Sequence, residues 1–185
     1  MQIRNTQQRY GVVAQLFHWV IVALIITQFV LAIKADALGI GPAKIAVLAR
    51  HKSVGLTIFG LAVLRLLWRW INPIPPNPPH TPAWQHFAAR ASHAALYALI
   101  LITPMLGWLM SSARGFSVSW FGLVTLPDLV ARDKDKYDFF LAAHQTVALT
   151  LAAIAIVHAA AALKHHFLDR DDVLRRMLPL RTPRE

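Results

Sequence analysis

Two histidines set fourteen residues apart constrain the fold of this chain more than any other feature. His144 and His158 lie within one uncharged stretch, residues 139–163. On an α-helix this spacing separates the two rings by about 21 Å along the axis and leaves them within roughly 40° of the same face. Ionisable rings are costly in hydrocarbon unless a partner occupies them. The spacing therefore indicates a membrane helix that holds two bound groups at two depths.

The composition agrees with a membrane location. Of the 185 residues, 56% are hydrophobic and only 15% are charged, whereas charged residues make up about a quarter of a soluble domain. Three charge-free runs, 11–33, 91–113 and 139–163, reach the roughly 20 residues needed to cross a bilayer. A fourth span covers about 45–70 if the side chains of Arg65 and Arg69 extend to the interface.

These runs predict an all-α fold, a four-helix transmembrane bundle in one domain of residues 1–185, with helices at about 11–33, 45–70, 91–113 and 139–165. The first run is too long for the 7–15-residue core of a secretory signal, so we expect it to be retained as a helix. Eleven of the nineteen basic residues fall on the side of the N-terminus, which predicts that both termini are cytoplasmic. We expect the lipid bilayer as a partner and no nucleic acid.

Histidine is the main candidate metal ligand, because the chain has nine histidines and no cysteine. In the four-helix topology, His51 and His144 share the outer depth, whereas His18 and His158 share the cytoplasmic depth. His93 opens the third helix at the same cytoplasmic depth and competes with His18. A set of hydrogen-bonding histidines or a proton relay is the plainer alternative.

Matched depths favour two b-type haems, each held by two imidazoles, because this ligation supports electron transfer without an open iron site. The two haems would form an electron path across the membrane. Arg65 lies fourteen residues after His51, which places it on the same helix face near the lower haem. Its guanidinium could bind a haem propionate, or it could simply extend to the interface.

The remaining segments have plainer interpretations. Residues 72–82 contain six of the eleven prolines and predict a stiff extended connector, with a proline-recognition motif as the alternative. The basic tail, residues 164–185, is expected to lie along the anionic cytoplasmic leaflet. His80 and His86 are interpreted as hydrogen-bonding or interfacial residues, and His165 and His166 as facing headgroups or solvent. The alternative is that His165, His166 and Lys164 contribute to a quinone site.

Several short motifs occur together in a recognisable order. They are Gln15-Leu-Phe-His18-Trp19, Arg50-His51-Lys52-Ser-Val-Gly55, Arg65-Leu-Leu-Trp-Arg69, His93 with Tyr97, His158-Ala-Ala-Ala-Ala-Leu-Lys-His165-His166, and Leu174-Arg175-Arg176-Met177-Leu178-Pro179. Together they make the chain resemble the bacterial cytochrome b561 family of small four-helix di-haem membrane cytochromes. The resemblance runs from Tyr10 to about Pro179.

This resemblance implies two haem b groups with His18, His51, His144 and His158 as iron ligands. It also implies a bacterial inner-membrane location and ubiquinone as the redox partner. One well-known member of the family is a superoxide oxidase that passes electrons to quinone. The wider family includes cytochrome b subunits of hydrogenases and formate dehydrogenases.

Basic residues on the outer side make an anionic substrate plausible. Arg50 and Lys52 flank His51, and further lysines and arginines lie on the outer loops. Such a cluster can raise the association rate of a small anion, but it would serve an acidic protein donor equally well. The sequence therefore predicts a superoxide:quinone oxidoreductase. The alternatives are an electron-transfer or anchoring subunit of a dehydrogenase or hydrogenase and a haem-free transporter or scaffold.

Overall fold

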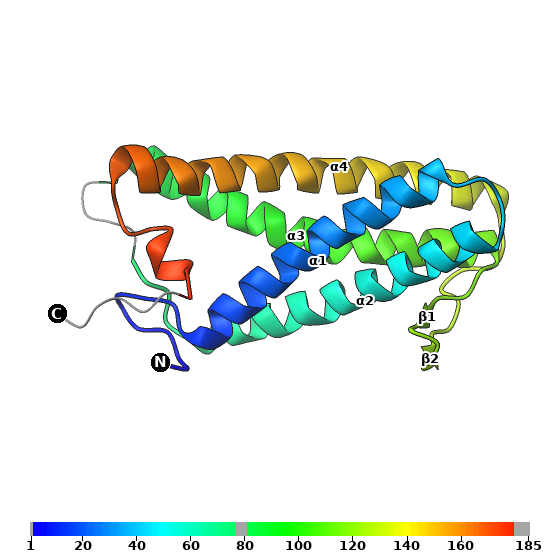
Figure 1. The fold of residues 1–185 in the computed structure, drawn as a ribbon, viewed down its shortest axis with the longest axis horizontal. Coiled ribbons are helices and arrows are strands. Elements are labelled where there is room, and N and C mark those ends of the chain that lie inside the picture. Colours follow the sequence, from blue (N-terminus) through cyan, green and yellow to red (C-terminus); the bar gives the residue numbers. More distant parts are fainter. Residues whose placement is uncertain (1, 77–80, 180–185) are drawn as a thin grey trace.

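Four long helices make up most of the structure, a computed structural model that describes residues 2–76 and 81–179 (Figure 1). They are α1 (Val12–Ala37), α2 (Pro42–Trp70), α3 (Ala83–Arg114) and α4 (Lys134–Lys164). Each is long and apolar enough to cross a membrane. The prediction of an all-α bundle of four membrane-spanning helices is confirmed. His80 of the connector lies outside the described residues.

The bundle has two chemically different ends. Helices α1 and α2 pack on each other, α3 packs on α4, and contacts between α2 and α3 join the two pairs. We call the end that holds residues 2–11, 71–76 and 165–179 the terminal end. The opposite end, which holds residues 38–41 and 115–133, we call the hairpin end.

An apolar core fills the middle of the bundle. Its buried side chains come from all four helices and are Ile21, Ile58, Ala62, Ile100 and Leu151. Leu151 lies seven residues from both His144 and His158, and Ile58 lies seven residues after His51. Seven residues are about 10 Å along a helix, so the core separates two histidine levels. Many apolar side chains elsewhere face outward, as lipid-facing residues do, among them Leu149 at 67% exposure.

The helices extend beyond the charge-free runs that predicted them. Helix α3 begins at Ala83 instead of 91, and α4 begins at Lys134 instead of 139. A charge-free run marks only the part of a helix in hydrocarbon, whereas charged turns continue the helix into the interface. At the start of α4, Asp133 caps the helix by accepting the backbone N–H of Lys136 at 3.0 Å, which lowers the pKa of Asp133.

A short β-hairpin between α3 and α4 was not predicted. Strand β1 (Ser119–Trp120) pairs antiparallel with β2 (Val124–Thr125). The turn residues Phe121 and Gly122 have φ angles of 50° and 75°. The hairpin is fastened to α2 by Ser53, whose hydroxyl donates to the Ser119 carbonyl at 3.1 Å and accepts the Phe121 N–H at 2.9 Å.

The described part of the tail is held against the N-terminal segment. After a π-helical turn, His165–Asp169, and a 3-10 turn, Arg175–Met177, the chain folds back over the terminal end. Main-chain carbonyls of the tail accept hydrogen bonds from the N-terminal region: Arg176 from the Tyr10 N–H, Met177 from the Trp19 indole at 2.9 Å, and Leu178 from the Arg9 guanidinium at 2.8 Å. The tail and the N-terminal segment therefore form one cap.

Replacing Ser53 by alanine should destabilise the fold, because the partly buried N–H of Phe121 would lose its acceptor and the hairpin would lose its attachment to α2. We expect a loss of about 1–3 kcal/mol, measured as lower thermal stability of the detergent-solubilised protein by circular dichroism. Ser117→Ala is the matched control, since Ser117 is an exposed serine of the same loop. Equal stability of the two variants would contradict this role of Ser53.

Candidate functional site

Four of the predicted ligand histidines form two ring pairs, one on each side of the apolar core. At the hairpin end, the ring centroids of His51 and His144 are 6.2 Å apart, with an interplanar angle of 73°. At the terminal end, those of His18 and His158 are 6.5 Å apart, with an angle of 75°. The rings that the depth argument paired therefore lie close together in the structure.

These separations can be compared with the geometry of a metal bound between two imidazoles. A metal–imidazole bond is about 2.0 Å long, and adding roughly 1.1 Å from nitrogen to ring centre gives about 6.3 Å between the centres of two opposed rings. Both observed separations are close to this value. Each pair thus has room for one metal atom between its rings.

His93 has a different relation to the terminal-end pair. Its ring centroid lies 5.3 Å from that of His158, which is about 1 Å less than the opposed geometry requires. Its ring also lines a cavity together with Arg65 and Tyr97. His18 therefore fits opposite His158 better than His93 does, although both lie at the same depth.

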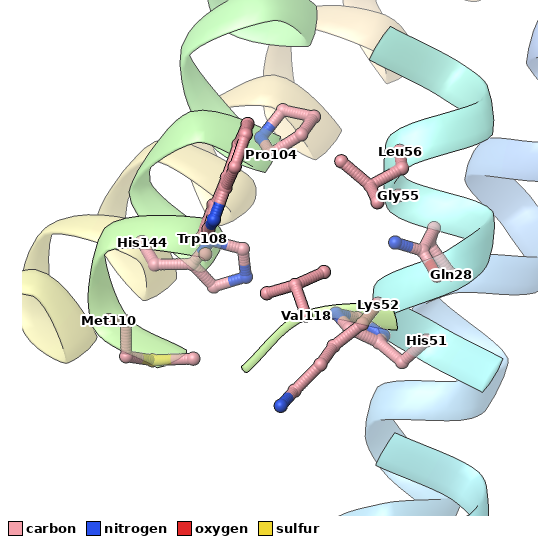
Figure 2. Close-up of a pocket in the computed structure, with 11 residues that line it drawn as sticks. Gln28, His51, Lys52, Gly55, Leu56, Pro104, Trp108, Met110, Val118 and His144 are labelled. Carbon is pink, nitrogen blue, oxygen red and sulfur yellow. The ribbon is translucent and has the colours of Figure 1, made fainter. Parts of the chain in front are cut away.

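A pocket between α2 and α3 contains the hairpin-end pair (Figure 2). His51 and His144 lie on opposite sides of it. Gly107 of α3 leaves space for the imidazole, because a Cβ atom at this position would lie 3.1 Å from Cε1 of His144. A glycine here allows the α3 backbone to pack closely against the flat imidazole ring.

The hydrogen bonds of the rings also fit metal binding. Nδ1 of His144 lies 2.9 Å from the Thr103 carbonyl. As donor, Nδ1–H leaves the lone pair of Nε2 available to a metal, and such second-shell bonds commonly orient ligand histidines. In contrast, Nδ1 of both His18 and His51 is buried without a partner among the described residues. Unsatisfied buried nitrogens are costly, and a bound group can offset this cost.

The two basic residues that flank His51 are in different positions. Lys52 is half-buried, lines the pocket and lies over the Phe116 ring, with 5.8 Å from Nζ to the ring centroid. Arg50 is exposed and is not among the residues that line the pocket. Of the two, Lys52 can therefore contact a small anion beside the histidine pair, whereas Arg50 can act only at longer range.

Arg65 lines a cavity near the terminal-end pair, as its spacing from His51 predicted. Its guanidinium carbon lies 5.4 Å from the centroid of the Tyr97 ring. Arg69 and Trp68 line the same cavity, and the indole Nε1 of Trp68 is buried without a partner among the described residues. Sequence reasoning missed both as site residues, although Arg69 lies one helical turn after Arg65. Together these donors form an environment suited to a carboxylate.

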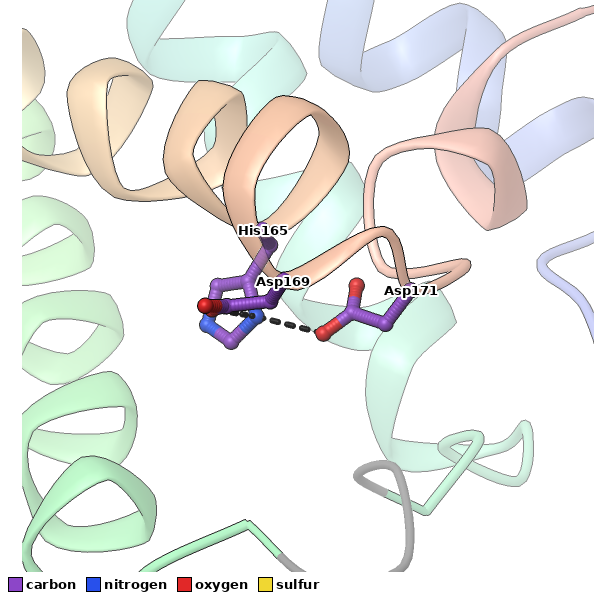
Figure 3. Close-up of side chains that lie close together, drawn as sticks. All are labelled: His165, Asp169 and Asp171. Atoms are coloured by element: carbon purple, nitrogen blue, oxygen red, sulfur yellow. Dashed lines mark hydrogen bonds and ion pairs between the residues drawn. The ribbon is translucent and has the colours of Figure 1, made fainter.

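His165 takes part in a separate polar cluster after α4 (Figure 3). Its Nδ1 lies 2.6 Å from an Asp171 carboxylate oxygen and 3.3 Å from one of Asp169. Asp169 also accepts two hydrogen bonds from the Lys164 ammonium, at 2.6 and 2.8 Å. The ligand atoms are close enough for a metal site, but the lysine already neutralises Asp169. The cluster fastens the π-helical turn and the start of the tail.

Comparison with known proteins agrees with this arrangement. A family model described as prokaryotic cytochrome b561 matches residues 9–180. Cytochrome b561 homolog 2 of Escherichia coli (strain K12) is 37% identical over 182 residues, which cover 96% of this chain and 95% of that protein. Cytochrome b561 homolog 1 of the same organism is 32% identical, covering 71% of this chain and 74% of its own length. The protein named "Probable superoxide oxidase CybB" of Yersinia pestis is 32% identical, covering 70% and 73%.

Three findings point to the same family. The helices are long and apolar enough to cross a membrane, four histidines lie in two pairs, and the similarity extends along nearly the whole chain. The family implies b-type haem, and the two pairs of imidazole rings are suitable ligands for its iron. The chain therefore belongs to the prokaryotic cytochrome b561 family of membrane electron-transfer proteins.

Proposed function

We propose that this chain binds two b-type haems and transfers electrons from a donor at the hairpin end to membrane quinone. His51 and His144 would hold one haem iron, and His18 and His158 the other. The observation that carries this proposal is the pair of ring separations, 6.2 and 6.5 Å. When bound, each haem supplies an iron centre that accepts and releases one electron.

The protein's own contribution is to hold, orient and insulate the two centres. The carbonyl of Thr103 orients His144, and Gly107 makes space beside it. At the terminal end, Arg65 is the proposed partner of a haem propionate, because a guanidinium can bind a carboxylate through two hydrogen bonds. The apolar core around Leu151 keeps water from the region between the two levels.

Superoxide is the proposed donor, and ubiquinone the proposed acceptor. Two superoxide ions would each release one electron and become dioxygen, while one quinone would take up both electrons and two protons to become quinol. A relative named as a probable superoxide oxidase supports this choice. The half-buried cation of Lys52 beside the hairpin-end pair supports it independently, while Arg50 would contribute to longer-range steering.

We propose the bacterial inner membrane as the location, with both termini in the cytoplasm. The excess of basic residues at the terminal end supports this orientation. The hairpin end would then face the periplasm. Periplasmic superoxide could reach the hairpin-end pocket without crossing the bilayer.

The ligand assignment can be tested by counting haems in alanine variants. Purified wild-type protein should contain two low-spin b-type haems per chain by pyridine haemochrome assay, because two imidazoles saturate each iron. His51→Ala or His144→Ala should remove or convert to high spin only one haem, and His18→Ala or His158→Ala only the other. Electron paramagnetic resonance distinguishes low-spin from high-spin iron.

His93→Ala is the matched control for the terminal-end pair and should leave both low-spin signals in place. Loss of a haem in His93→Ala together with a normal spectrum in His18→Ala would mean that His93 is the ligand. A ratio of one haem per chain, or ready carbon monoxide binding by intact protein, would overturn the four-ligand assignment.

Gly107→Ala should disturb the hairpin-end haem selectively, because the added methyl group would lie 3.1 Å from the His144 ring. We expect a lower haem content or a high-spin signal at that site and an unchanged signal from the other. Gly60→Ala serves as control, since no described neighbour lies within 4 Å of a Cβ at Gly60. Identical spectra for both variants would show that the space beside His144 is not required.

Stopped-flow mixing of oxidised protein with superoxide tests the enzymatic proposal. Haem reduction should be fast and should slow as ionic strength rises, because exposed charges are screened within about 10 Å. Lys52→Gln should lower the bimolecular rate by roughly 3- to 10-fold, with Arg50→Gln having a smaller effect. Arg90→Gln, which removes one charge from α3 near the terminal end, should have none.

In all three variants, haem content and reduction by dithionite should be unchanged. Superoxide that reduces wild-type haem no faster than it dismutates would reject the oxidase proposal. Co-purification of a large redox subunit would then favour the alternative, a cytochrome b subunit of a dehydrogenase or hydrogenase. Rapid reduction without salt dependence would retain the reaction but reject the steering role of Lys52 and Arg50.

A further inference from the structure

The connection between α3 and α4 has two halves of opposite character. Residues 115–127, which include the β-hairpin, carry no charged side chain. The next eleven residues, 128–138, which complete the connection and form the start of α4, carry seven. A loop that runs entirely through water has little reason to contain such an apolar half. The composition therefore separates a segment suited to lipid from a segment suited to water.

Hydrogen bonds fix the depth of the apolar half beside a membrane-spanning helix. The Ser53 hydroxyl holds the hairpin backbone, and the indole of Trp120 donates to the Thr57 hydroxyl at 3.1 Å. Ser53 begins the charge-free part of α2, and Thr57 lies one turn further into it. The hairpin consequently does not project along the bundle axis beyond the helix ends. It lies against the side of α2, as Figure 1 also shows.

The hairpin presents large apolar side chains that the protein does not cover. Leu123, Val124 and Phe121 are 75%, 57% and 55% exposed. Phe121 and Gly122 have φ angles of 50° and 75°, the left-handed conformations that a type I′ hairpin turn requires. The Phe121 ring contacts the Trp120 ring, with 5.6 Å between their centroids, but more than half of the residue stays exposed.

We propose that the segment Phe116–Leu126 is inserted into the lipid leaflet at the hairpin end, with Phe121, Leu123 and Val124 in contact with acyl chains. The acyl chains of the same leaflet already surround the outward faces of α1 to α4, so the proposed surface continues the lipid-facing belt. Trp120 and Phe116 lie at the level where interfacial aromatic residues gather. This inference does not depend on the bound cofactor or the substrate.

The backbone of the hairpin limits how deep it can lie. Unpaired strand edges are not tolerated in the centre of a bilayer. Here the edge that faces α2 is satisfied by Ser53, and further bonds join the Leu126 N–H to the Val118 carbonyl and the Leu123 N–H to the Trp120 carbonyl. This partial pairing suits the boundary between headgroups and acyl chains, not the bilayer centre.

Insertion would also place the hairpin between the hairpin-end pocket and the surrounding lipid. Val118, directly before β1, is only 2% exposed and lines the pocket that contains His51 and His144. The apolar outer surface of the hairpin would face lipid while Val118 faces the pocket. The hairpin would thus separate the hairpin-end site from the acyl chains beside it.

Site-directed spin labelling tests this proposal cleanly, because the chain contains no native cysteine. Single variants Leu123→Cys, Val124→Cys and Phe121→Cys would be spin-labelled in full-length protein reconstituted into phosphatidylethanolamine–phosphatidylglycerol vesicles. Leu149→Cys provides a lipid-facing reference on α4, and Asp135→Cys provides a water-facing reference from the charged half of the connection. Power saturation then measures collisions with dioxygen, which partitions into lipid, and with a water-soluble nickel chelate.

Labels at Leu123 and Val124 should resemble the Leu149 reference, with frequent dioxygen collisions and several-fold fewer nickel collisions than the Asp135 reference. Nickel accessibility equal to that at Asp135 would overturn the proposal by placing the hairpin in water. Protection from both reagents would overturn it in favour of a covering protein surface. An unchanged circular-dichroism spectrum and thermal transition in each variant show that the fold is intact. Agreement between the labels at Leu123 and Val124 excludes an effect confined to Phe121.

Discussion

A histidine ring is stable inside an apolar helical bundle only if something occupies its nitrogens, and this requirement organises the whole chain. Four rings from three helices meet in two pairs, with separations of 6.2 and 6.5 Å. Between the pairs lies a layer of purely apolar side chains that includes Ile58 and Leu151. The fourteen-residue spacing in α4 places one ring above this layer and one below it, so a single helix spans both levels. Gly107 leaves space beside the His144 ring, and the Thr103 carbonyl orients that ring through its Nδ1. Neither contact adds charge to the interior.

Much of this arrangement could be predicted because membrane helices follow simple rules. The length of the charge-free runs predicted the four helices. Because successive helices cross the membrane in opposite directions, the position of each histidine in its helix predicted its depth. Depth alone paired His51 with His144, since no other predicted intramembrane histidine shares that level. At the other level it could not separate His18 from His93, because both lie at the same depth on different helices. Only the lateral arrangement of α1, α3 and α4 separates them, through distances of 6.5 and 5.3 Å to the His158 ring.

Features that depend on tertiary contacts were not predictable in this way. The strands β1 and β2 contain two residues each, too few for a recognisable alternation, and the hairpin owes its position to Ser53 of a distant helix. The charge of the tail predicted a position along lipid but not its contacts within the protein. Its main-chain carbonyls accept hydrogen bonds from Arg9, Tyr10 and Trp19. Hydrogen bonds of the backbone position both the hairpin and the tail, and amino-acid composition does not reveal such bonds.

The two ends of the bundle differ in a way that bears on the direction of electron flow. The hairpin-end pocket has one lining cation, Lys52, and an adjoining apolar hairpin. The terminal-end cavity has two, Arg65 and Arg69, beneath the cap formed by the N-terminal segment and the tail. Positive charge near a redox centre favours its reduced form, because the reduced form carries the additional electron. If each ring pair holds one haem and a propionate compensates the charge of Arg65, the charge of Arg69 remains, and it would favour electron movement from the hairpin-end haem to the terminal-end haem. The same arrangement leaves Lys52, the one lysine or arginine among the described residues that line the hairpin-end pocket, at the end where an anionic donor would bind.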